Sequence, residues 1–217
     1  MSMFIMDGKT FIKTFINEDP DKVLETQFVI VSSTIRKLGK ARWDKQVINS
    51  NNLLYPSQAL IMEYDEYKGN VNYQNEYWNQ LDNAKPLFAT LIKYVIESNY
   101  TVVFLCGKKE MKYDYLNLIK RYLYQEFGFY VYDYKKLKNG KEEPKSYNES
   151  EVLKKCKKIL KKSRKEKREM MLSTERGRKE YFSNMTKKEL REELKNLGLY
   201  EPSMDKSEMR DMLETFA

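Results

Sequence analysis

The residue types of this chain favour the binding of anions over any other chemistry. Its 217 residues include 40 Lys and Arg, no His, and two Cys, Cys106 and Cys156. The absence of His removes the commonest general base and the commonest zinc ligand, and two Cys cannot complete a structural zinc site. We therefore assign no catalytic residue, no metal site and no cofactor, and lean towards a non-enzymatic protein.

The densest group of cations is the run KKCKKILKKSRKEKR, residues 154–168. Residues 151–180 hold 13 Lys and Arg against 5 Asp and Glu, a net charge of +8 that equals the net charge of the whole chain. Charge concentrated in one segment indicates a polyanionic partner more clearly than a high overall pI does. The candidate nucleic-acid-binding residues of this run are Lys154, Lys155, Lys157, Lys158, Lys161, Lys162, Arg164, Lys165, Lys167 and Arg168.

A solvated connecting helix is the alternative interpretation of this run. In a helix, however, Lys residues three and four positions apart repel one another. Contacts with phosphates would relieve that repulsion and would release counterions as they form. The segment Glu149–Leu172 is predicted to be helical, with Ser150 as its N-cap. Its apolar residues Val152, Leu153, Cys156, Ile159 and Leu160 fall on one stripe that would dock on the body of the chain.

A second set of candidate anion-binding residues follows two predicted strands, QFVIVSST (27–34) and TVVFLC (101–106). Ligands of open α/β sheets usually bind at the carboxyl ends of the strands, and hydroxyls, amides and cations suit an anion. Polar loops commonly follow strands, so an ordinary loop is the open alternative. Cys106 is expected to be a small buried residue rather than a nucleophile. The candidates are Ser32, Ser33, Thr34, Arg36, Lys37, Arg42, Gly107, Lys108 and Lys109.

The elements that must position these residues predict an α/β fold. Continuous apolar strands suit a parallel sheet covered on both faces, and a further strand is predicted over residues 129–134. Helices are predicted over residues 41–55, over 86–99 with Pro86 in the first turn, and over 112–128 with Gly128 as the C-cap. Residues 60–69 either add a strand or form an insertion. The expected architecture is a mostly parallel sheet flanked by helices, then a basic helix and a small helical hairpin.

Three segments are expected along the chain. Residues 1–147 form the α/β body, which ends in the turn-rich NGKEEPKSYNES (139–150). Residues 148–180 form the basic helical segment, and residues 181–217 form a C-terminal module. We expect no membrane partner, because no run of about 18 apolar residues exists. MSMFIMDGKTF, at the start, also lacks the pattern of a signal peptide. A cytoplasmic protein is expected.

The C-terminal segment, residues 185–216, carries a recognisable pattern. Thr186 and Glu189 form a capping box at the start of a helix, Leu190, Leu194 and Leu197 are expected to form its apolar stripe, and the Leu197-Gly198-Leu199 turn ends it. A second helix opens at Lys206 and contains Met209-x-x-Met212-Leu213. This segment resembles the SAP and helix–extension–helix family of small modules.

The resemblance implies DNA binding through helix N-termini and basic side chains, here Thr186, Lys187, Lys188 and Lys206. The segment departs from the family pattern because residues 181–217 carry a net charge of −2 and YEPSMD replaces the Gly-rich link. Binding of a protein partner through this module, or a hairpin that only caps the fold, therefore stays open.

Together, the basic run and the adjoining module favour a nucleic-acid-binding accessory or regulatory protein, with DNA preferred over RNA. An AT-rich codon bias would explain the Lys, Asn and Tyr content and suggests a phage or mobile-element origin. One alternative is an enzyme that acts on a nucleotide or another phosphorylated ligand at the strand-end loops. The other is a protein-interaction factor that inhibits or redirects a host machine.

Overall fold

The computed structural model describes residues 3–14, 26–30, 47–49, 51–67, 71–98, 100–107 and 115–216. The chain divides into two compact units, residues 1–160 and residues 161–217. The boundary falls within the longest helix, α8 (Glu149–Leu172). Each unit has its own cluster of buried apolar side chains.

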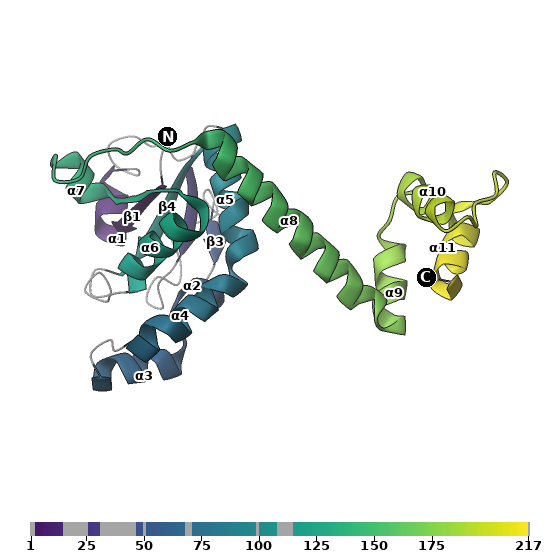
Figure 1. Cartoon of the computed structure of the whole chain (residues 1–217), viewed down its shortest axis with the longest axis horizontal. Helices are drawn as coiled ribbons and strands as arrows, with labels where there is room; N and C mark the ends of the chain where they lie inside the picture. Colours follow the sequence, from purple (N-terminus) through teal and green to yellow (C-terminus); the bar gives the residue numbers. More distant parts are fainter. Residues whose placement is uncertain are drawn as a thin grey trace. The chain divides into compact units, whose positions relative to one another are not determined.

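The first unit is an α/β domain around a five-stranded sheet in the order β3-β2-β4-β1-β5, in which every neighbouring pair is parallel. Helices α1, α5 and α6 lie against this sheet (Figure 1). The mostly parallel sheet flanked by helices is thus confirmed. The strands are β1 (Met3–Asp7), β2 (Thr26–Ile30), β3 (Val47–Asn49), β4 (Thr101–Cys106) and β5 (Val131–Asp133).

The helices of this unit connect and cover the strands. In chain order they are α1 (Gly8–Phe11), α2 (Asn51–Leu54), α3 (Gln58–Tyr67), α4 (Val71–Asn83), α5 (Lys85–Glu97), α6 (Tyr115–Phe127), α7 (Tyr134–Lys138) and the first part of α8. Pro86 lies in the first turn of α5, where its missing N–H leaves no intrahelical bond unmade. Gly128 ends α6 with a φ of 72°, a conformation that glycine adopts without strain. Both predictions are confirmed.

The two strands predicted from unbroken apolar runs are neighbours in one sheet. Strand β2 pairs with β4 in parallel, with Thr26 opposite Thr101 and Ile30 opposite Leu105. Strand β4 is buried along almost its whole length, as expected for a strand covered on both faces. The prediction that residues 27–31 and 101–105 belong to one parallel sheet is confirmed for 27–30 and 101–105, and residue 31 lies outside the described residues.

Three local predictions are wrong or incomplete. Residues 47–49 form strand β3 rather than helix, because Val47 and Ile48 pair in parallel with Phe28 and Val29; tertiary pairing outweighs a weak helical pattern. Residues 58–67 form helix α3, so the segment 60–69 adds no strand within its described part. Strand β1 was not predicted, although it lies between β4 and β5.

Helix α8 has the predicted bounds, and its apolar stripe docks as expected. Val152 and Cys156 are buried, and Ile159 and Leu160 pack against the core of the first unit. Burial raises the pKa of the Cys156 thiol to about 11. The N-cap is Asn148 rather than Ser150, since the Asn148 side-chain oxygen accepts a hydrogen bond from the Glu151 N–H at 3.3 Å.

The second unit is a small helical domain with three helices after α8: α9 (Glu175–Ser183), α10 (Lys187–Asn196) and α11 (Lys206–Phe216). Its core contains Phe182, Leu190, Leu194, Met204, Met209 and Leu213. Leu172, in the last turn of α8, packs against this core. The predicted C-terminal helical hairpin therefore exists as α10 and α11, and α9 completes its core.

Candidate nucleic-acid interface

Helix α8 presents all ten predicted cations of residues 154–168 to solvent. The residues that this helix buries, Val152 and Cys156, lie on the opposite side from Lys154 and Lys158. Side chains three and four positions apart on a helix are neighbours, so ten cations in fifteen residues create a continuous positive surface. The exposure of every one of them is the first requirement for contact with a polyanion.

Four of the ten cations have a carboxylate partner. Two pairs lie within α8, Lys162 with Glu166 and Lys165 with Glu169, both at 3.6 Å. Lys157 approaches Glu97 of α5 at 3.7 Å. Arg168 donates to Glu193 of α10 at 2.6 Å. Such exposed ion pairs contribute little to stability. They nevertheless place a negative charge beside the cation, which weakens the electrostatic attraction between that cation and a phosphate.

The remaining cations form an unpaired row. Within the described part of the chain, no carboxylate lies within 4.0 Å of the side-chain nitrogens of the other six. Five of them follow one another at intervals of three or four residues along α8: Lys154, Lys158, Lys161, Arg164 and Lys167. At 1.5 Å per residue these five positions extend over about 20 Å of helix, and at 3.6 residues per turn they wind about half-way around it. We call these five residues the unpaired cation row.

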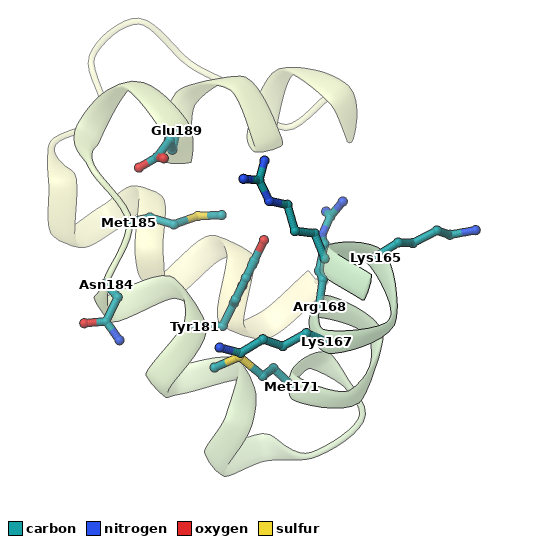
Figure 2. A pocket seen from close by; sticks show the side chains of 9 residues that line it. Lys165, Lys167, Arg168, Met171, Tyr181, Asn184, Met185 and Glu189 are labelled. Atoms are coloured by element: carbon teal, nitrogen blue, oxygen red, sulfur yellow. The ribbon is translucent and has the colours of Figure 1, made fainter. Parts of the chain in front are cut away.

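The second unit contains a concavity of about 630 Å³ where α8, α9 and the start of α10 meet (Figure 2). Four of the predicted cations line it, and sequence reasoning missed its other members. Figure 2 shows Lys165 pointing away from the other lining side chains and the Tyr181 hydroxyl pointing away from α9. The lining residues are Arg164, Lys165, Lys167, Arg168, Met171, Tyr181, Asn184, Met185 and Glu189.

The capping box predicted for α10 is present. The Thr186 hydroxyl accepts from the Glu189 N–H at 3.3 Å and donates to the Glu189 carboxylate at 2.7 Å, and the Thr186 N–H donates to the same oxygen at 2.8 Å. These hydrogen bonds, from the backbone first, lower the pKa of Glu189. The N–H and the hydroxyl of Thr186 are therefore already hydrogen-bonded to Glu189 of the same helix, which makes Thr186 a weaker candidate for phosphate contact.

The start of α11 differs from the expected cation site. Lys206 is exposed, but Asp205 directly before it accepts hydrogen bonds from the N–H groups of Ser207 and Glu208 at 2.7 and 2.9 Å. The Asp205 carboxylate thus occupies the helix N-terminus that a phosphate would need. Lys187 and Lys188 are exposed on α10.

The predicted anion site at the sheet edge falls mostly outside the described residues. Ser32, Ser33, Thr34, Arg36, Lys37, Arg42, Lys108 and Lys109 all lie there, and Gly107 alone of this set is described. The adjacency of β2 and β4 does bring the two strand ends together. Cys106 is fully buried and its thiol lies 3.4 Å from the Met6 carbonyl oxygen, as expected for a structural residue.

Asp7 is a buried carboxylate at the same sheet edge that sequence reasoning missed. It ends β1, opposite Cys106, and is 3% exposed. Its carboxylate accepts from Lys135 at 2.6 Å, from the Thr10 hydroxyl at 2.7 Å and from two backbone N–H groups. Burial raises the pKa of Asp7, but these hydrogen bonds outweigh burial and hold the pKa at about 2. The signal in the sequence was an acidic residue directly after an apolar run.

The depressed pKa of Asp7 predicts a pH-dependent contribution to stability. A carboxylate with a folded-state pKa below its usual value of 3.8 stabilises the fold above that pH, and this stabilisation is lost as the pH falls towards 2. We expect Asp7→Asn to lower the free energy of unfolding by about 2 kcal/mol at neutral pH, and by much less near pH 2. Urea unfolding at several pH values measures this difference. Glu143→Gln, an exposed carboxylate, is the control; a difference that does not shrink in acid would contradict the assignment.

Two negative findings apply to the described residues only. No group of three or more Cys, Asp or Glu side chains there is arranged to hold a metal ion. No helix in that part of the chain combines the length and hydropathy needed to cross a membrane. Finally, no family model, no curated protein and no solved structure matches this chain.

Proposed function

We propose that this chain is an accessory protein that binds nucleic acid, with the backbone phosphates held by α8 and by the concavity of residues 161–217. The unpaired cation row carries the proposal. Like charges at intervals of three and four residues destabilise a helix, and here no carboxylate of the described chain offsets them. A row of phosphates supplies the missing counter-charge and releases condensed counterions on contact.

The C-terminal module supports DNA as the preferred nucleic acid only through its resemblance to the SAP and helix–extension–helix family. The capping box of α10 and the positive φ of Gly198 at 71° agree with that resemblance. The carboxylate of Asp205 at the start of α11 argues against phosphate contact there. The basic residues of α8 therefore contribute more to the proposal than those of the module.

The first test is a binding titration of the full chain with duplex DNA, duplex RNA and a free nucleotide at several salt concentrations. If the five cations of the row each contact a phosphate, the slope of log affinity against log salt on duplex DNA should be about −4 to −5. A free nucleotide should bind far more weakly, because it offers a single phosphate group to the row. Absence of binding to both duplexes, and to one of their separated strands, near physiological salt would reject the proposal and favour a protein-interaction factor.

A second candidate function is the binding of a phosphorylated ligand at the carboxyl edge of the sheet. The observation that favours it is the parallel pairing of β2 with β4, from which both candidate loops depart. Lys135, which also lies at this edge, is already engaged by Asp7. Substantial binding of the free nucleotide in the same titration, with little dependence on salt, would favour this second function.

A further inference from the structure

The concavity of the second unit contains more apolar surface than phosphate binding needs. Met171, Tyr181 and Met185 are each half-buried and contribute side chains to its lining. A row of cations on an exposed helix is sufficient for backbone phosphates. An aromatic ring and two thioethers beside those cations suit a flat, apolar group that carries phosphates at its edges. Its volume, about 630 Å³, lies in the range of pockets that hold small organic groups.

Tyr181 is held in a defined orientation at this site. Its ring packs edge-on against the buried ring of Phe182, with the ring centroids 5.4 Å apart and an interplanar angle of 70°. Phe182 occupies one side of the Tyr181 ring. The Tyr181 hydroxyl points away from α9 (Figure 2). Asn184 is also fixed, because its amide nitrogen donates to the Glu180 carbonyl oxygen at 2.9 Å, which leaves its side-chain oxygen as an acceptor.

The positive and negative side chains that line the concavity lie on different helices, the cations on α8 and Glu189 on α10. Arg168 pairs with Glu193 and Lys165 with Glu169, so the unpaired cations of the lining are Arg164 and Lys167 of α8. Glu189 lies on α10, and its carboxylate accepts the hydrogen bonds from the Thr186 N–H and the Thr186 hydroxyl through one oxygen, Oε2. Phosphates therefore favour the α8 side, whereas the amino group of a base is compatible with the remaining oxygen on the α10 side.

We propose that this concavity holds an unpaired nucleobase, stacked on Tyr181, with its flanking phosphates on Arg164 and Lys167. The inference rests on the proposed binding of nucleic acid. It restricts the nucleic acid that this concavity binds to one that contains a single-stranded stretch. A base inside a duplex is stacked between its neighbours and cannot present its face to an aromatic side chain. Stacking on an aromatic ring is tolerant of sequence, since every base has such a face.

The test compares affinity for a labelled single strand with affinity for the duplex formed with its complement, at one salt concentration. Tyr181→Leu keeps apolar volume against Phe182 but removes the stacking face. It should weaken single-strand binding about 5- to 150-fold and change duplex binding less than about twofold. Tyr181→Phe should retain single-strand affinity. Tyr124→Leu, a change at an exposed tyrosine of the first unit, is the matched control.

The controls separate this inference from the proposed function. Arg164→Gln combined with Lys167→Gln should weaken binding of both strands and duplexes; no effect on either would reject the proposed function itself. If that double variant weakens binding but Tyr181→Leu affects strand and duplex equally or not at all, only the base-stacking inference is overturned. Photocross-linking of a single strand containing 5-iodouracil gives a direct readout. The cross-link is expected at Tyr181, and a cross-link confined to other aromatic residues would also overturn the inference.

Discussion

Replacing Lys161, Lys162, Arg164 and Lys165 with Gln is expected to weaken nucleic-acid binding about 30- to 1,000-fold at roughly 0.15 M salt. Each phosphate contact contributes about 0.7 of a decade in affinity at that salt, and two to four contacts would be lost. The slope of log affinity against log salt should flatten by roughly 0.9 for each contact removed on duplex DNA. Fluorescence anisotropy across a salt series measures both quantities.

The fold should survive this quadruple change. All four side chains are exposed, and none belongs to the apolar stripe of Val152 and Cys156. Gln has nearly the helix propensity of Lys and Arg, so the far-ultraviolet circular dichroism of the variant should match that of the parent.

A matched control removes the same charge from the first unit. Lys13, Lys136, Lys138 and Lys141 are all exposed, and their replacement by Gln should leave the affinity within about threefold, because none of them belongs to α8 or lines the concavity. If both quadruple variants weaken binding equally, net charge rather than the α8 surface is responsible. If neither does, α8 is a solvated connecting helix.

Sequence reasoning predicted α8 well because the physics that forms this helix is local. Its apolar residues recur at helical spacing, its flanks supply turn residues, and its predicted bounds agree with the structure. The same holds for the capping box of α10, which needs only Thr186 and Glu189 three residues apart. Strands β2 and β4 were predictable because unbroken apolar runs of their length suit a buried parallel strand.

The features that the sequence did not predict depend on contacts between residues that are distant along the chain. Strand β3 has three residues, and only its pairing with β2 distinguishes it from the start of a helix. Asp7 acquires its environment from Lys135, 128 residues away. Helix α9 was not predicted, because it buries little beyond Phe182 and its sequence is strongly charged. The concavity follows from α9, since packing of Phe182 and Leu190 in one core brings Tyr181 and Met185 to α8.

Phe182→Ala is expected to unfold the second unit and leave the first unit folded. Phe182 is 1% exposed in the core of residues 161–217, and truncation of a buried Phe costs about 3–5 kcal/mol. A unit of this size has a total stability of only about 3–8 kcal/mol. The first unit has a separate core, and Val152 and Cys156 of α8 belong to it.

Hydrogen exchange distinguishes the two units in the Phe182→Ala variant. Amides of α10 and α11 should lose protection, whereas those of β4 should exchange as in the parent. Leu197→Ala is the control, because Leu197 is 47% exposed and its truncation should cost less than about 0.5 kcal/mol. Faster exchange in β4 as well would show that the two cores are coupled.

The Phe182→Ala variant also separates the two parts of the proposed interface. The cations of α8 do not depend on the second core for their charge, so salt-dependent binding to duplex DNA should persist in reduced form. The concavity requires α8, α9 and α10 together, so any preference for single strands should disappear. A variant that lacks the second core yet keeps that preference would place the base-binding surface outside residues 161–217.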